Sequence, residues 1–145
     1  MSDWTRICCA VDFSEPSRLA LARAAALASR GGADLLLVHV YEVPQPAGEL
    51  LVAAVDLTGP AAAEAERTMR GWVEEATRLR GAPVRARILA GQPALEVTQA
   101  AVEAGCDLVV VGTHGRTGVK RLVLGSVAER IVREARCDVL VARAG

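Results

Sequence analysis

The sequence predicts an α/β fold, in which five parallel strands form a doubly wound, Rossmann-like sheet with helices on both faces. Strand-like and helix-like segments alternate along all 145 residues. Residues 34–40 are apolar almost throughout and do not alternate, which is typical of a strand covered on both sides. The apolar content of 52% consists mostly of Ala, Val and Leu, as suits tightly packed layers. We expect one domain that spans residues 1–145.

The first half of the chain contains two expected strands and two expected helices. A strand at residues 6–11 is followed by a helix that begins after Ser14, a typical N-cap, and ends near residue 30 at two glycines. Residues 34–40 form the second strand. Residues 41–60 include three prolines and two glycines, which predicts a long loop with room for one helical turn. An amphipathic helix at 61–80 follows from a stripe with helical spacing: Ala62, Ala65, Met69, Trp72, Val73, Ala76 and Leu79.

The second half continues the alternation. Residues 84–89 alternate apolar and charged side chains, which favours a strand at the edge of the sheet. A helix at 93–104 and a strand at 107–111 come next. A helix at 127–135 and a last strand at 139–142 complete the order β-α-β-α-β-α-β-α-β.

A ligand in such a sheet lies beyond the carboxyl ends of the strands, where the strand order reverses. With the order 2-1-3-4-5 the reversal would lie between the first and third strands. With the order 3-2-1-4-5 it lies between the first and fourth, so that Asp12 and Gly112 face each other across the crevice. We favour the second order because it brings together the two most unusual strand ends.

The loop at 112–125 is a candidate phosphate site. It holds four glycines and the basic residues Arg116, Lys120 and Arg121, without a carboxylate, in a chain whose net charge is zero. Glycines permit a positive φ and close approach of the backbone to a ligand, and a following helix directs its N–H groups toward an anion. The spacing G-x-x-x-x-G-K-[ST] is absent, and so is G-x-G-x-x-G, which argues against a P-loop NTPase or an NAD enzyme.

Each polar candidate also has a structural explanation. Ser126 begins the pattern S-x-x-E of a capping box, and we expect it both to cap the helix and to bind the ligand. Asp12 is a possible turn residue or an acceptor for a ribose or a base, and the backbone of Val40 is a possible partner of a base edge. His39 is expected to be a satisfied core histidine, and His114 a positioning or solvent-facing residue.

The remaining composition argues against several classes of protein. The balance of 17 basic and 17 acidic side chains does not favour nucleic-acid or membrane-surface binding. No apolar run approaches the roughly 20 residues of a membrane span, and the N-terminus lacks the pattern of a signal peptide, so we expect a cytoplasmic protein. Cys8, Cys9, Cys106 and Cys137 are expected to be small buried thiols, with no disulfide or metal site.

The glycine loop resembles the ATP-binding signature of the universal stress protein family, G-x2-G-x9-G-[ST]. Gly112, Gly115, Gly125 and Ser126 fit it without a gap, and the segments 10–14 and 37–40 and the closing strand are also similar. Gln92 departs from the family, since many members carry Asp there, and this affects a helix cap. We expect the following residues to contact the nucleotide: Ala10, Val11, Asp12, Val40, Gly112, Thr113, His114, Gly115, Arg116, Gly125, Ser126 and Val127.

The resemblance implies further properties. Asp12 and Val40 would contact the adenosine, and the glycine loop with Ser126 and Val127 would contact the ribose and phosphates. The expected ligand is ATP, with or without Mg²⁺, and AMP and cyclic AMP are the alternatives. The family also implies a homodimer through the last strand, Val139 to Ala142. We see no nucleophile with a neighbouring base, so we expect a nucleotide-responsive binder with at most slow ATP hydrolysis. A phosphatase or nucleotidyl-transfer enzyme, and an interaction module without nucleotide, are the alternatives.

Overall fold

The computed structural model describes residues 4–42, 59–113 and 124–144. Its elements, in chain order, are β1 (Arg6–Ala10), α1 (Glu15–Gly31), β2 (Asp34–Tyr41), α2 (Pro60–Arg80), β3 (Arg85–Ala90), α3 (Pro93–Glu103), β4 (Leu108–Gly112), α4 (Ser126–Glu134) and β5 (Asp138–Ala142). The sheet has the order β3-β2-β1-β4-β5 with every neighbouring pair parallel, so the predicted order 3-2-1-4-5 is confirmed. β3 lies at an edge, as its alternating sequence predicts.

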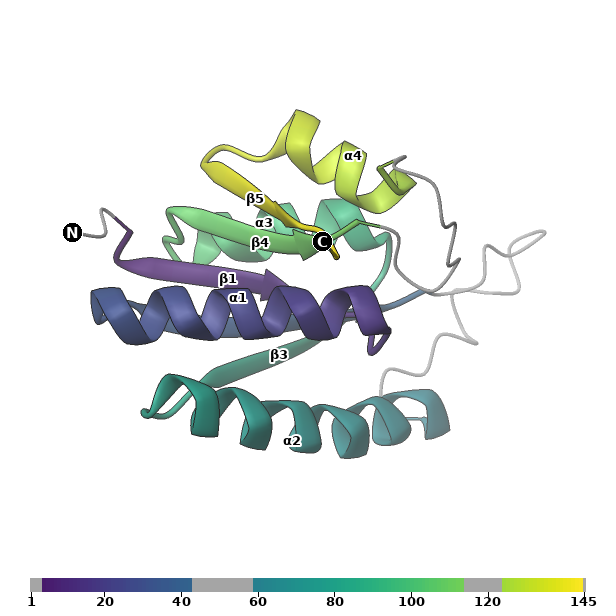
Figure 1. The fold of residues 1–145 in the computed structure, drawn as a ribbon. Helices are drawn as coiled ribbons and strands as arrows, with labels where there is room; N and C mark the ends of the chain where they lie inside the picture. Colours follow the sequence, from purple (N-terminus) through teal and green to yellow (C-terminus); the bar gives the residue numbers. More distant parts are fainter. Residues whose placement is uncertain (1–3, 43–58, 114–123, 145) are drawn as a thin grey trace.

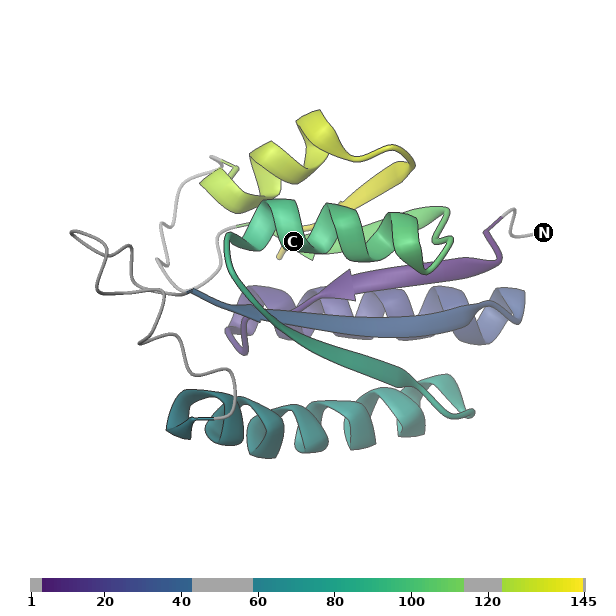
Figure 2. The same ribbon diagram turned by 180° about the vertical axis from the view of Figure 1, so that it is seen from behind.

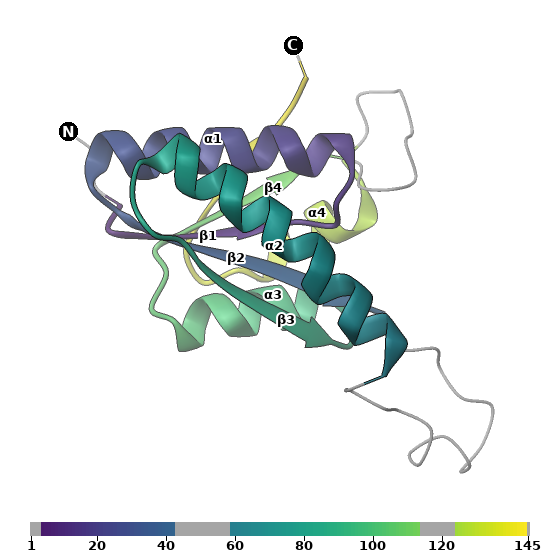
Figure 3. The same ribbon diagram turned by 90° about the horizontal axis from the view of Figure 1, so that it is seen from below.

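The sheet lies between two layers of helices. Helices α1 and α2 cover the face seen in Figure 1, and α3 and α4 cover the face seen in Figure 2. Figure 3 looks along the layers, with the strands between α1 and α3. One apolar cluster contains Cys9, Leu37 and Trp72 beneath α1 and α2, and the other contains Cys8 and Ile131 beneath α3 and α4. The adjacent cysteines of β1 therefore point to opposite faces, as strand geometry requires.

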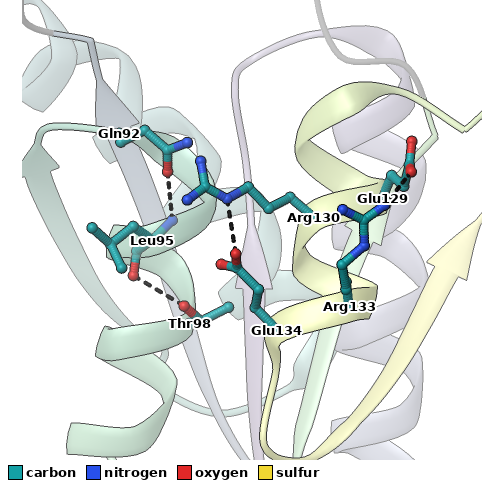
Figure 4. A network of polar contacts seen from close by, with 7 residues as sticks. All are labelled: Gln92, Leu95, Thr98, Glu129, Arg130, Arg133 and Glu134. Atoms are coloured by element: carbon teal, nitrogen blue, oxygen red, sulfur yellow. Dashed lines mark hydrogen bonds and ion pairs between the residues drawn. The ribbon is translucent and has the colours of Figure 1, made fainter.

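Local sequence signals determine where most helices begin and end. The Ser14 side chain accepts a hydrogen bond from the Ser17 N–H at the start of α1, and Gly32 ends that helix in the left-handed region with φ 67°. Gln92 caps α3 by accepting a hydrogen bond from the Leu95 N–H at 2.9 Å (Figure 4), so the departure from the family pattern still supplies a cap.

The apolar stripe of α2 packs on the sheet with one exception. Ala62, Ala65, Met69, Trp72 and Ala76 are buried, and Val73 is partly buried against the same cluster. Leu79 is 43% exposed, so its predicted burial is wrong. It lies in the last turn of the helix, immediately before Gly81 turns the chain toward β3. The predicted loop at 41–60 falls mostly on 43–58, outside the described residues.

No helix in the described segments is both long enough and apolar enough to cross a lipid bilayer.

A carboxylate ties the start of β1 to the start of β4. Asp107 accepts hydrogen bonds from the Thr5 N–H at 2.9 Å, the Thr5 hydroxyl at 3.1 Å and the Arg6 N–H at 3.1 Å. Partial burial acts to raise the pKa of Asp107, but these hydrogen bonds to the ionised form outweigh it and lower the pKa. The contact joins residues about a hundred positions apart at the amino-terminal edge of the sheet.

Asp107→Asn should lower the free energy of unfolding at neutral pH by about 1–2 kcal/mol, because an amide accepts these hydrogen bonds less well than a carboxylate. Since the pKa of Asp107 is lower in the folded chain, its contribution is fully present above the unfolded pKa and is lost as the pH falls through the folded pKa. Urea unfolding from pH 2 to pH 7 should therefore show a weaker pH dependence in the variant. Glu66→Gln, at an exposed position of α2, is the control and should leave the profile unchanged.

Candidate functional site

A cavity of about 630 Å³ opens at the carboxyl ends of β1, β2 and β4. The first turns of α2, α3 and α4 also line it, together with the turn between β1 and α1. This is the edge of the sheet at which the strand order reverses, between β1 and β4. The volume lies within the range of typical small-molecule sites.

The cavity brings together the described residues that the sequence marks as nucleotide contacts. Nine of the twelve line it: Ala10, Val11, Asp12, Val40, Gly112, Thr113, Gly125, Ser126 and Val127. The other three, His114, Gly115 and Arg116, lie outside the described residues. Residues from β1, β2, β4 and α4 thus meet at one place although they are far apart in the chain.

Asp12 stands at the end of β1 in a network of hydroxyl groups. Its Oδ1 accepts hydrogen bonds from the Ser14 N–H at 3.0 Å, from the Ser14 hydroxyl and from the Ser17 hydroxyl at 2.8 Å. The Asp12 N–H donates to the Ser17 Oγ at 3.0 Å. Asp12 is therefore a turn residue and a cavity residue at once, because the same contacts that hold the turn fix the carboxylate at the cavity wall.

Phe13 holds the turn from the other side. Its φ of 67° lies in the left-handed region, which costs a residue other than glycine of order 1 kcal/mol. The ring stacks on His39 with a centroid distance of 4.0 Å and contacts Trp72 at 5.4 Å. His39 is buried, and its Nδ1 donates to the Val11 carbonyl at 2.8 Å, so the predicted satisfied core histidine is confirmed. The stack thereby supports the strand end that carries Asp12.

The first turn of α4 faces the cavity without a side-chain cap. The N-cap is Gly125, and Ser126 is the first helical residue, so the expected capping box is wrong. The Glu129 side chain, which a capping box would direct back to the start of the helix, instead accepts a hydrogen bond from Arg133, one turn further along, at 2.6 Å (Figure 4). Ser126, Val127 and Ala128 line the cavity, and the backbone N–H groups of a first turn have no partners within their own helix.

The glycines at the two ends of the loop have backbone conformations that other residues also adopt. Neither uses the positive φ that glycine permits: Gly112 is absent from the glycines with positive φ, and Gly125 has φ −64° and ψ 159°. A Cβ on Gly112 would lie 2.6 Å from the Pro16 carbonyl oxygen, so Gly112 lets β4 approach the first turn of α1. The Gly125 N–H donates to the Thr113 carbonyl and joins the two ends of the loop.

The backbone of Val40 points into the space beyond β1. In β2 the Val38 carbonyl accepts a hydrogen bond from the Val11 N–H at 2.9 Å, just past the last pair of the β1–β2 ladder. Backbone groups two residues apart in a strand point the same way. The N–H and C=O groups of Val40 therefore point toward the side on which β1 lies, at a level of the sheet where β1 has already ended. Val40 lines the cavity, so a backbone donor and acceptor lie at its wall.

Two parts of the cavity wall carry no motif that marks them in the sequence. Glu64 and Thr68, one turn apart on α2, line the cavity beside the stripe that packs on the sheet. Their spacing of four residues indicates that both lie on one face of the helix, but only the fold shows that this end of α2 reaches the cavity. Ser17 is also missed, since it lies on the buried face of an otherwise apolar helix.

Ser17→Ala should weaken ligand binding at this cavity by about three- to tenfold, because one hydrogen bond to the Asp12 carboxylate and one from its N–H are lost. Since Ser17 is 4% exposed, stability should also fall by about 1 kcal/mol. Calorimetric titration with ATP measures the first effect and urea unfolding the second. Ser29→Ala, at an exposed position of the same helix, is the matched control, and an equal loss of affinity there would contradict a role for Ser17.

Comparison with known proteins identifies the fold and the family. The profile of the Universal stress protein family matches residues 3–143. The chain belongs to the universal stress protein family. A universal stress protein from Thermus aquaticus is 40% identical over 136 residues, which cover 92% of this chain and 95% of the relative. Universal stress protein MJ0531 from Methanocaldococcus jannaschii is 30% identical over 140 residues, with coverage of 97% and 82%.

Solved universal stress proteins share the architecture. UspA from Lactobacillus plantarum has a TM-score of 0.86 at 26% identity and covers 99% of this chain and 100% of its own. A universal stress protein in complex with cAMP has a TM-score of 0.74 at 23% identity, with 98% of both chains covered. The dAMP complex of the Archaeoglobus fulgidus universal stress protein has a TM-score of 0.65 at 22% identity and covers 97% of this chain and 99% of its own. The last two show a likeness of fold.

Proposed function

We propose that this universal stress protein binds an adenine nucleotide in the cavity at the reversal of strand order and acts as a nucleotide-responsive regulator in the stress response. One observation carries the proposal: the first turn of α4, without a side-chain cap, shares a single cavity with the Asp12 carboxylate and the Val40 backbone. An anion site, a hydroxyl acceptor and a hydrogen-bonding backbone edge are the three groups that a nucleotide requires.

Each part of the nucleotide has a proposed partner. The phosphates lie at the N-terminus of α4, with Ser126 and Val127, where the helix dipole favours negative charge. The Asp12 carboxylate accepts from a ribose hydroxyl, and the backbone of Val40 pairs with the edge of the adenine. His114, Gly115 and Arg116 are proposed to complete the phosphate site, on the ground of the G-x2-G-x9-G-[ST] signature.

We propose ATP as the preferred nucleotide because the complete glycine signature and three basic residues at 116–121 favour several phosphates over one. Universal stress proteins of the same fold bind cAMP and dAMP, which keeps a single phosphate as the alternative. Mg²⁺ would bind together with the nucleotide, coordinated by its phosphates. Within the described residues 4–42, 59–113 and 124–144, no group of three or more His, Cys, Asp or Glu side chains could hold a metal ion.

Isothermal titration calorimetry with ATP, AMP and cyclic AMP, each with and without Mg²⁺, tests the proposal. We expect saturable binding of ATP and weaker binding of the two monophosphates. If none of the three binds at millimolar concentration, the proposed function is wrong. Mass spectrometry of the purified protein under native conditions gives an independent readout, because a co-purified nucleotide would identify itself by its mass.

We also propose a homodimer through β5 and a cytoplasmic location, both on the ground of family membership. β5 is an edge strand, and its residues 139–141 are only partly buried within one chain. Sedimentation equilibrium should therefore give twice the mass of the chain. A monomer at micromolar concentration would contradict the dimer without affecting the nucleotide proposal.

A further inference from the structure

The wall that α2 contributes to the cavity carries polar side chains to which the proposed nucleotide contacts assign no role. Glu64 and Thr68 line the cavity, together with Ala61 and Ala65 of the same helix. Their spacing of three and four residues places them on one face of its first turns. Ala65 is buried, whereas Glu64 and Thr68 are exposed. One carboxylate and one hydroxyl group therefore border an otherwise apolar helix face at this end of the cavity.

This face of α2 lies at the opposite end of the cavity from the N-terminus of α4. Helix α2 packs on β2 and β3, whereas α4 packs on β5. Because the sheet has the order β3-β2-β1-β4-β5, the ends of β2, β1 and β4 lie between the two helices. Figure 1 shows α4 at one end of the series of strands and α2 at the other. A ligand that crosses the cavity therefore meets α4, β4, β1, β2 and α2 in that order.

A nucleotide in the proposed orientation follows the same order. Its phosphates lie at α4, its ribose lies at Asp12 just after β1, and its adenine lies at Val40 in β2. The edge of the adenine that extends past Val40 then faces α2 and the side chain of Glu64. The direction of the nucleotide is that of the proposed function, on which the inference therefore rests.

Glu64 and adenine are complementary in their hydrogen-bonding groups. A carboxylate accepts hydrogen bonds and donates none, whereas the 6-amino group is the donor on the edge of adenine. Guanine has a carbonyl oxygen at the same position, and two acceptors that face each other repel. The Thr68 hydroxyl both donates and accepts, so it does not distinguish the two bases. Of these two side chains, only Glu64 discriminates between an amino group and a carbonyl group.

We propose that Glu64 determines the base specificity of the cavity: its carboxylate accepts a hydrogen bond from the 6-amino group of adenine and rejects a purine that has a carbonyl group there. The Glu42 carboxylate also lines the cavity, just beyond the end of β2. Glu64 is the better placed of the two, because the buried Met69 and Trp72 hold α2 on the sheet. A side chain on a packed helix is positioned more precisely than one on a connecting segment.

Calorimetric titration of the full-length protein with ATP and with inosine triphosphate tests the proposal. Inosine triphosphate has the 6-carbonyl group of guanine but lacks the 2-amino group, which is a further donor to a carboxylate. We expect the wild type to bind ATP more tightly than inosine triphosphate. Glu64→Gln should reduce the ratio of the two affinities by about five- to tenfold, because an amide donates to the carbonyl oxygen as readily as it accepts from the amino group.

The ratio of affinities also removes the effect of net charge, since both triphosphates gain equally from the loss of a carboxylate. Glu66→Gln is the matched control. It makes the same change at an exposed position of α2 that does not line the cavity, and it should keep the wild-type ratio. Because Glu64 is exposed, its replacement leaves the apolar core intact, and circular dichroism of the variant verifies the fold.

The outcomes distinguish a failure of base selection from a failure of nucleotide binding. If the protein binds ATP and the ratio is the same in Glu64→Gln as in the wild type, Glu64 does not select the base, while the proposed function stands. An equal fall of the ratio in Glu66→Gln, or a fall in Glu42→Gln without one in Glu64→Gln, would also overturn the assignment to Glu64. If neither triphosphate binds at millimolar concentration, the proposed function fails and base selection fails with it.

Discussion

Replacing Gly112 by alanine should lower the free energy of unfolding by about 2–3 kcal/mol, although the change adds a single methyl group. The new Cβ would lie 2.6 Å from the Pro16 carbonyl oxygen and 2.7 Å from its carbon. Both are backbone atoms at the start of α1, so neither can move aside as the end of a flexible side chain would. Either β4 or the first turn of α1 must shift, and urea unfolding measures the cost.

Gly71→Ala is the matched control for this prediction. Gly71 lies at an exposed position of α2, and a Cβ there would have no atom within 4 Å. We expect this change to stabilise the protein by up to about 1 kcal/mol, because alanine is the better helix former. A Gly112→Ala variant as stable as the wild type would show that the approach of β4 to Pro16 is not a constraint on the fold.

Asp12→Ala should weaken adenine nucleotide binding by about 10- to 100-fold. The change removes the carboxylate that we propose as the acceptor for the ribose, and a hydrogen bond to a charged group contributes about 1.5–3 kcal/mol. It also removes the acceptor for Ser14 and Ser17, so the turn itself loses support. Calorimetric titration at a temperature at which urea unfolding shows the variant to be folded measures the loss of affinity.

Glu15→Ala controls for the change of charge. Glu15 is an exposed carboxylate in the first turn of α1, three residues from Asp12, and it is not among the residues that line the cavity. It should bind nucleotide within about twofold of the wild type, because its exposed carboxylate does not line the cavity and is open to solvent. Equal losses in the two variants would mean that net charge, and not the Asp12 carboxylate, governs binding.

Several features were predictable because they depend on short-range chemistry. The Ser14 cap and the Gly32 end of α1 follow from local backbone requirements, and the structure contains both. The strand order follows from one further idea, that Asp12 and Gly112 should meet at one reversal point, and the observed order confirms it. The burial of both faces of β2 follows from its unbroken apolar run.

The features that the sequence did not predict correctly depend on contacts between distant parts of the chain. The pattern S-x-x-E at Ser126 satisfies the capping box in sequence, but the helix begins one residue earlier than this reading requires, and Glu129 pairs with Arg133. A glycine in a loop suggests a special φ, but Gly112 owes its identity to the backbone of Pro16 nearly a hundred residues away. Ser17 resembles a neutral helix residue until the fold brings it against Asp12.

The sequence by itself therefore determined the order of elements, the parallel sheet with its reversal point, and the residues of the nucleotide signature, because hydrophobic periodicity and helix-end chemistry act over a few residues. The tertiary structure decided what surrounds those residues. It brought Glu64 and Thr68 into the cavity wall, left the first turn of α4 facing that cavity, and placed Ser17 against Asp12. Contacts of this kind depend on how distant backbones pack, and no local pattern records the distance between two elements that meet only in the folded chain.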